Sequence, residues 1–212
     1  MVPADLGFRH RFIPAPHKAA PVLLLLHGTG GDESDLIPMG EQLAQAIPGG
    51  AHLLSPRGKT LENGMPRFFR RLAEGVFDIE DLKFRAAELA RFIESAAQVY
   101  GFDARKVIAV GYSNGANIAV AVLLLHPGVL SAAILLRPMI PFEPEKLPDL
   151  TGVRIFIAGG QRDPIVPPGQ TQRLATLLES AGADVELFRH TGGHELGQAE
   201  LVASARWLSR LG

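Results

Sequence analysis

The chain contains no cysteine among its 212 residues, and that absence excludes several kinds of chemistry at once. A disulfide framework, a thiolate nucleophile and a metal centre ligated by cysteine all require this residue. There is also no excess of charge of one sign, because 21 basic side chains face 22 acidic ones and leave a formal net charge of −1. This balance gives no electrostatic reason to expect nucleic acid or an anionic membrane surface as a partner.

Long hydrophobic runs are missing as well. The longest purely apolar run, Ile118–Leu125, is far shorter than the roughly 20 residues that a helix needs to cross a bilayer, so no membrane span is predicted. The first residues, MVPADLGFRHRF, lack the basic start and continuous apolar core of a secretory signal, and we therefore expect a cytoplasmic protein. Nothing in the sequence decides the oligomeric state, so a homodimer is left open.

What the chain does contain is an alternation of short apolar runs with helical patterns. Apolar residues make up 47% and charged residues 20%, as in ordinary globular proteins, and the length suits a single domain over residues 1–212. The apolar runs lack polar alternation, which is typical of strands buried on both faces. They span residues 21–28, 51–56, 106–111, 131–136 and 153–159. This pattern predicts an α/β fold, with a mostly parallel central sheet flanked by helices on both faces and no separate cap domain.

The segments between these strands are less uniform. The clearest helical pattern is a stripe of apolar residues that recur at steps of three and four from Leu82 to Tyr100, followed by a glycine that can end the helix. Two early segments, residues 8–13 and 21–26, are candidates for an antiparallel pair at one edge of the sheet. Two long segments, Arg57–Glu80 and residues 137–150, break the alternation, and we interpret them as loops that form the walls of a substrate pocket.

Residues 111–115 read GYSNG and follow the apolar run Val107–Val110. Because a helical pattern comes next, Ser113 is expected on a sharp turn from strand to helix. Such a turn needs small residues two positions before and two positions after the serine, and it exposes the hydroxyl above the sheet. The five-residue pattern alone is common by chance, but the strand before it and the helix after it favour a nucleophile.

A serine hydroxyl needs a base to take its proton and an acid to orient that base. In this sheet topology the expected chain order is serine, then an acid, then histidine. Asp163 follows a strand, and His194 lies in a glycine-rich turn beyond the later strand that contains VELFRH. His190 is the weaker alternative for the base. The alternatives for the acid all precede strands, at the wrong end of the sheet: Asp103, Asp149 and Asp184.

The negative oxygen that develops on an attacked carbonyl needs fixed donors, and backbone N–H groups serve well. We expect one donor from Asn114, which begins a helix whose dipole is positive at that end. The other is expected from Thr29 in HGTGGDESDL, where glycines let the backbone approach, while His27 is interpreted as a structural hydrogen-bonding residue. Phosphate binding by this loop is not favoured, because Asp32 and Glu33 would repel the phosphate and no Lys-Ser/Thr pair follows.

The walls of the pocket are expected from two places. Met139 and Ile140 follow the strand at 131–136 and should face the mouth of the site, while Phe68 and Phe69 are the apolar candidates in the long loop. Ordinary anchoring of the loops is an equal alternative for all four. A nearby basic cluster could attract a substrate carboxylate, but acidic residues follow closely, so mutual surface pairing is the favoured interpretation. The cluster consists of Arg57, Lys59, Arg67, Arg70 and Arg71.

Four segments, HGTGGDESDL, GYSNGANIA, AGGQRDPIVP and TGGHEL, resemble the α/β-hydrolase superfamily and occur in the order found there. More narrowly, they resemble its compact carboxylesterase, phospholipase and acyl-protein-thioesterase-like branch, which lacks a cap domain. The resemblance spans about Phe8 to Trp207 and implies that Ser113, Asp163 and His194 form a catalytic triad. The residues at the two expected oxyanion positions depart from the thioesterase pattern, where a larger apolar residue and glutamine are usual, and this departure favours a carboxylesterase.

The expected function is that of a serine carboxylesterase, which hydrolyses short- to medium-chain carboxylic esters through an acyl-enzyme. Its substrate would be a small-molecule or polymeric ester, and no metal or organic cofactor is implied. A thioesterase, a lysophospholipase or an acyltransferase would use the same triad. A non-catalytic binding protein on a hydrolase scaffold is less favoured, because no triad member is missing. The dienelactone hydrolases, a related branch, use a cysteine nucleophile that this chain lacks.

Overall fold

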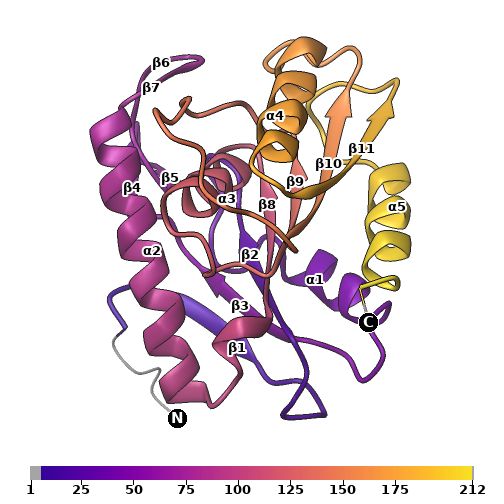
Figure 1. The fold of residues 1–212 in the computed structure, drawn as a ribbon. Helices are drawn as coiled ribbons and strands as arrows, with labels where there is room; N and C mark the ends of the chain where they lie inside the picture. Colours follow the sequence, from indigo (N-terminus) through magenta and orange to yellow (C-terminus); the bar gives the residue numbers. More distant parts are fainter. Residues whose placement is uncertain (1–5, 212) are drawn as a thin grey trace.

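The computed structural model describes residues 6–211, which build a seven-stranded sheet at the centre of the molecule (Figure 1). Neighbouring strands run parallel except at one edge, where β1 is antiparallel to β3. The predicted α/β architecture with a mostly parallel sheet is therefore confirmed. In order across the sheet, the strands are β1 (His10–Ile13), β3 (His52–Pro56), β2 (Val22–Leu26), β8 (Val107–Tyr112), β9 (Ala132–Leu136), β10 (Arg154–Gly160) and β11 (Asp184–His190).

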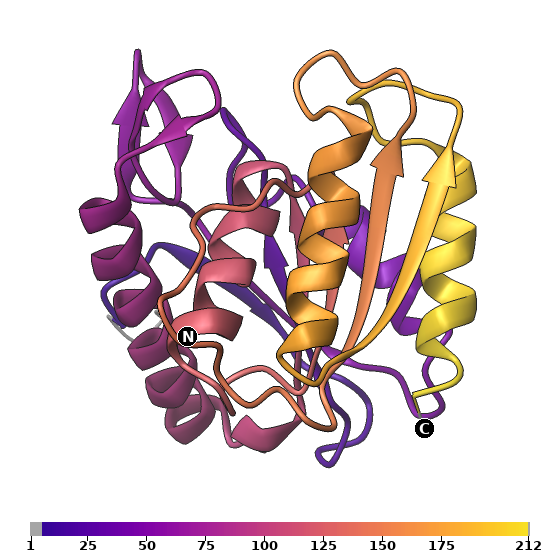
Figure 2. The same cartoon turned by 45° about the horizontal axis from the view of Figure 1, so that its top comes forward.

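Helices cover both faces of the sheet (Figures 1 and 2). In β2, Val22, Leu24 and Leu26 pack on one face, whereas Leu23 and Leu25 pack on the other. Since successive side chains of a strand point to opposite faces, a strand with helices on both sides has to be apolar throughout. One face carries α2 (Ile79–Tyr100), α3 (Asn114–Leu125) and α4 (Pro168–Ser180), and the other carries α1 (Ile37–Ala44) and α5 (Gln198–Leu208).

The longest helix, α2, begins and ends at residues suited to those positions. Asp78 caps its first turn by accepting a hydrogen bond from the backbone N–H of Asp81 at 3.1 Å. Gly101 follows its last residue with a φ of 74°, a left-handed conformation that glycine adopts without a steric penalty. The predicted apolar stripe faces the core between these ends, with Leu82, Ala86, Leu89, Ile93 and Ala96 all buried.

The segment Arg57–Glu80, expected to be a loop, contains two small hairpins beside α2 (Figure 1). The first turns at Asn63 and Gly64, whose φ angles are 51° and 80°. An Asn-Gly pair is the usual signal for such a two-residue turn, so the sequence carried this information and our interpretation missed it. The hairpin strands are β4 (Thr60–Glu62) with β5 (Met65–Arg67), and β6 (Arg71–Ala73) with β7 (Val76–Phe77).

The partner expected for the edge strand was wrong. β1 pairs with β3, His10 opposite Pro56, and not with β2, because β3 and β8 already occupy both edges of β2 in parallel register. The short 3-10 helix η1 (Ala104–Lys106) leads into β8. Among the helices of residues 6–211, none combines the length and apolar character that crossing a bilayer requires.

Candidate active site

Ser113 stands between the end of β8 and the start of α3, with φ 50° and ψ −110°. Non-glycine residues seldom adopt a positive φ, so the turn is strained and its surroundings must hold it in place. The backbone N–H of Ser113 donates to the carbonyl of Leu136 at 2.8 Å, and its carbonyl accepts from the N–H of Asn117 at 3.0 Å. The serine is thereby fixed at the carboxyl edge of the sheet, where ligands bind in open α/β sheets.

The two glycines of GYSNG are required by close backbone contacts. A Cβ on Gly115 would lie 1.9 Å from the carbonyl oxygen of Leu26, and one on Gly111 would lie 2.6 Å from the carbonyl oxygen of Gly115. Neither overlap can be relieved by turning a side chain, because the opposing atoms belong to the backbone. The mechanical reason that the sequence suggested for the motif therefore applies in this fold.

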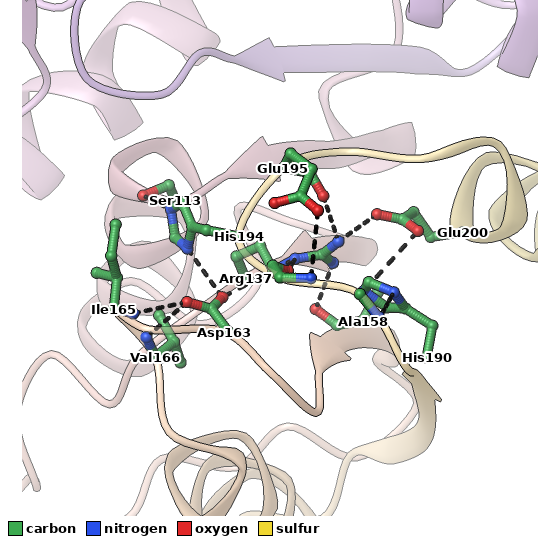
Figure 3. A network of polar contacts seen from close by, with 12 residues as sticks. Ser113, Arg137, Ala158, Asp163, Ile165, Val166, His190, His194, Glu195 and Glu200 are labelled. Carbon is green, nitrogen blue, oxygen red and sulfur yellow. Dashed lines mark hydrogen bonds and ion pairs between the residues drawn. The ribbon is translucent and has the colours of Figure 1, made fainter.

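The structure brings Asp163 and His194 to Ser113 (Figure 3). Nε2 of His194 lies 3.0 Å from Oγ of Ser113, and Nδ1 lies 2.8 Å from Oδ2 of Asp163. The carboxylate of Asp163 is fully buried, and its Oδ1 accepts hydrogen bonds from the backbone N–H groups of Ile165 at 2.8 Å and Val166 at 2.9 Å. With a proton on Nδ1, the imidazole donates to Asp163 and leaves Nε2 free to accept the serine proton.

The competing residues lie elsewhere. Nδ1 of His190 accepts from the N–H of Gly192 at 3.0 Å, its Nε2 lies 3.9 Å from Oε2 of Glu200, and the ring is separated from Ser113 by Arg137 (Figure 3). Asp184 begins β11, at the opposite end of the strand from the site. The fold therefore assembles only one acid–imidazole–hydroxyl row among these candidates.

Two backbone N–H groups beside Ser113 are unpaired. Those of Thr29 and Asn114 donate no hydrogen bond within residues 6–211, whereas the N–H of the neighbouring Gly30 donates to the carbonyl of Pro66 at 2.9 Å. Asn114 is also the first residue of α3, whose positive dipole end faces the same place. Such a pair of free, fixed donors can stabilise an anionic oxygen.

The whole described fold matches a known family. Residues 9–211 match the family model of the phospholipases and carboxylesterases, a branch of the α/β hydrolases. The chain belongs to this family. The chain is 48% identical over 186 residues to MhqD of Bacillus subtilis (strain 168), and the alignment covers 88% of this chain and 91% of that protein.

Two solved carboxylesterases have the same fold. The Bacillus cereus carboxylesterase is 45% identical, with a TM-score of 0.92, covering 98% of this chain and 96% of that one. The carboxylesterase from Mesorhizobium loti is 33% identical, with a TM-score of 0.88, covering 97% and 96% of the two chains. Together, the family match and these similarities identify the protein as a serine hydrolase that acts on carboxylic esters.

A cavity of about 270 Å³ opens beside the serine of this esterase. A larger cavity of about 580 Å³ lies at the amino ends of the strands, and it contains neither Ser113 nor His194. The smaller cavity is therefore the candidate substrate site, because it contains both Ser113 and His194. It is lined by Thr29, Arg67, Arg71, Gly75, Phe77, Tyr112, Ser113, Asn114, Asn117, Arg137, Met139, Ile165, Val166 and His194.

Only one of the four expected wall residues lines this cavity. Met139 does, and Oδ1 of Asn117 accepts a hydrogen bond from its backbone N–H at 2.8 Å. Phe68 and Phe69 are 3% and 0% exposed and belong to the hydrophobic core, and Ile140 packs against the same core. The expectation that these three residues form the cavity wall was therefore wrong. Their side chains pack in or against the core, because burying apolar surface there is more favourable than leaving it in a wet cavity.

His27 has the structural role inferred from the sequence. Its Nδ1 donates to the carbonyl of Gly28 at 2.7 Å, and its Nε2 accepts from the backbone N–H of Gly58 at 2.9 Å. Burial lowers the pKa of His27, which keeps the ring neutral and able to accept at Nε2. The histidine thus joins the turn after β2 to the segment that leads into the first hairpin.

Arg137 is the residue near the site that the sequence analysis missed. It is fully buried, has a φ of 58°, and its Nε lies 4.0 Å from Oδ2 of Asp163. Its guanidinium donates to the carbonyls of Gly193 at 2.9 Å and Glu195 at 2.7 Å, the residues on either side of His194, and it forms an ion pair with Glu200 (Figure 3). One side chain therefore connects the end of β9 to the loop before α5. Its position directly after an apolar strand was the available signal.

Tyr112 provides a second support for the same loop. Its hydroxyl donates to the backbone carbonyl of His194 at 3.0 Å, and the two rings lie 5.6 Å apart. Burial raises the pKa of the Tyr112 phenol, so the hydroxyl keeps the proton that this hydrogen bond needs. The loop that carries His194 is thus held from both β8 and β9.

Proposed function

We propose that Ser113, His194 and Asp163 are the catalytic triad of a carboxylesterase that cleaves small esters through an acyl-enzyme. The observation that carries this proposal is the unbroken row of hydrogen bonds from Asp163 through His194 to Ser113, at 2.8 and 3.0 Å. A nucleophile, a base and an orienting acid in this geometry are the parts that acyl transfer requires.

The reaction follows from the positions of these atoms. Nε2 of His194 takes the hydroxyl proton as Oγ of Ser113 attacks the ester carbonyl, and Asp163 stabilises the imidazolium that forms. The carbonyl oxygen becomes negative and is received by the backbone N–H groups of Thr29 and Asn114, each worth roughly 3 kcal/mol of barrier lowering. His194 then protonates the departing alcohol. A water molecule, activated by the same imidazole, releases the acid from Ser113 and restores the enzyme.

The size of the cavity supports esters with short acyl or alcohol groups. Its volume of about 270 Å³ lies at or below the lower end of the range for small-molecule sites. The apolar side chains that line it, among them Phe77, Met139 and Val166, suit a few methylene groups. Long acyl chains would have to extend into solvent and would gain little from additional length.

The test combines substrates of graded length with a single substitution. The parent should hydrolyse p-nitrophenyl acetate and butyrate with higher kcat/KM than the corresponding laurate, with an initial burst of p-nitrophenol if deacylation is slower than acylation. Ser113→Ala should lower kcat by about 10⁴-fold to 10⁶-fold. The matched control is Ser131→Ala, because the Ser131 hydroxyl donates to the carbonyl of Val107, outside the cavity. Activity of Ser113→Ala within tenfold of the parent would refute the assignment.

A further inference from the structure

The positive charges of the segment that contains the hairpins are not neutralised evenly. Outside the cavity, Arg57 is paired with both Asp32 and Glu33, and Arg70 is paired with Asp78. Lys59 likewise has its own partner in Glu88. This part of the basic cluster therefore shows the mutual pairing that the sequence favoured.

Inside the cavity the pairing is incomplete. Arg67 and Arg71 both line the cavity, and both are paired with a single carboxylate, that of Glu62. Among the lining residues there is no aspartate or glutamate. Arg137 also reaches the cavity, but its charge is offset by the buried carboxylates of Glu200 and Asp163. One excess positive charge is thus left on the wall that Arg67 and Arg71 form.

Arg67 is fixed next to the expected oxyanion position. Its side chain is 3% exposed, its Nε donates to the carbonyl of Phe69 at 3.2 Å, and its Nη1 donates to Oγ1 of Thr29 at 2.5 Å. Burial, and then repulsion from Arg71, lower the pKa of Arg67. An additional anion beside these two guanidinium groups would relieve that repulsion, since opposite charge favours the charged form.

Hydrogen-bond donors are also left over at this wall. Nε and Nη2 of Arg71 both donate to Glu62, while within residues 6–211 Nη1 of Arg71 and Nη2 of Arg67 have no hydrogen-bond partner. Unused donors and an excess positive charge point to an acceptor that carries negative charge.

We propose that the preferred substrate is a small ester with a free carboxylate, which Arg67 and Arg71 bind while Ser113 attacks the ester group. The carboxylate class is favoured because its two oxygens can accept from the one nitrogen that each arginine leaves over, and the small cavity excludes bulky anions. Half-esters of dicarboxylic acids and acylated hydroxy acids both belong to this class. The inference rests on the proposed esterase function and names its substrate.

The experiment compares esters that differ only in charge. In one pair, 4-acetoxybenzoate and 4-acetoxybenzamide, the charge lies on the leaving alcohol. In the other, the mono-4-nitrophenyl ester of adipic acid and its primary-amide analogue, the charge lies on the acyl group. For at least one pair, kcat/KM should be about 10-fold or more higher for the anionic ester, the factor expected from a charge-assisted hydrogen bond. Rising salt concentration should reduce this preference.

Variants then test the contributions of Arg71 and of Glu62, the carboxylate that Arg71 shares with Arg67. Arg71→Gln should lower kcat/KM for the anionic ester about 10-fold and change the neutral ester about twofold at most. Glu62→Gln should increase the preference, because it frees both arginines. The matched control is Arg70→Gln, which lies in the same segment but outside the cavity, is 63% exposed and pairs with Asp78. Arg70→Gln should leave kcat/KM unchanged for both the anionic and the neutral ester.

Two results would overturn the inference. The first is a parent enzyme that hydrolyses the neutral members of both pairs as fast as the anionic ones. The second is a preference that neither Arg71→Gln nor Glu62→Gln changes, and the second variant decides the case if the first does not fold. Both results leave the triad intact. Failure of the proposed function looks different, because Ser113→Ala would then keep parental activity on the neutral esters.

Discussion

Replacement of Arg137 by methionine should destabilise the protein severely. The guanidinium is fully buried and forms an ion pair with Glu200, whose side chain is 2% exposed. Without it, that carboxylate would keep only the hydrogen bond from the backbone N–H of Gly197 at 3.0 Å, and the carbonyls of Gly193 and Glu195 would lose a donor. Breaking one half of a buried pair costs about 3 to 5 kcal/mol, and each lost hydrogen bond from the charged guanidinium to a carbonyl adds roughly 1.5 to 3 kcal/mol.

A double variant separates the free-energy cost of an unpaired buried carboxylate from the net contribution of the ion pair to stability. In Arg137→Met with Glu200→Leu, the buried carboxylate of Glu200 is removed together with its partner. Asp163 loses the Arg137 cation in both variants and keeps its backbone hydrogen bonds. The free energy of unfolding should therefore recover by about 1 to 3 kcal/mol relative to Arg137→Met alone. Urea unfolding of the parent, both single variants and the double variant gives the four values, provided that the denaturant slope stays constant. The reasoning is refuted if Arg137→Met loses less than about 1 kcal/mol, or if the double variant is no more stable than this single one.

Four further substitutions test the fold and the site. Gly115→Ala forces a methyl group against the carbonyl of Leu26, 1.9 Å away, so we expect a loss of about 3 kcal/mol or more in thermal unfolding. Gly101→Ala meets open space but keeps a φ of 74°, so the loss should be only about 1 kcal/mol in the same assay, and equal losses would contradict the geometry. His194→Ala should lower kcat on p-nitrophenyl butyrate by at least about 10⁴-fold. His190→Ala should keep kcat within tenfold of the parent value. If His190→Ala lost activity and His194→Ala kept it, His190 would be the base.

The architecture and the meeting of the three site residues could be predicted because both follow from local rules. Strands buried on two faces are apolar throughout, as in β2. Helices can be predicted from a regular stripe of apolar residues, as in α2. Parallel strands deliver the residues that follow them to one edge of the sheet. Ser113, Asp163 and His194 each follow a strand, so their convergence needed only the topology.

The walls of the pocket could not be predicted because they depend on how the hairpins dock. Adjacent residues of an extended segment face opposite ways, so Arg67 reaches the cavity while Phe68 enters the core. This choice is set by a contact distant in sequence, the hydrogen bond from the backbone N–H of Phe68 to Oδ1 of Asn114 at 2.7 Å. The role of Arg137 could not be predicted for the same reason, because its partner Glu200 lies far away in the sequence, on α5.

The most direct test of the account is to locate the residue that a fluorophosphonate modifies. The reagent bonds to a serine only when a neighbouring base has activated it. Peptide mapping by mass spectrometry should find one adduct, on the peptide that contains Ser113, and no adduct in Ser113→Ala. An adduct on another side chain, or undiminished labelling of Ser113→Ala, would contradict the claim that the row from Asp163 through His194 to Ser113 performs the chemistry.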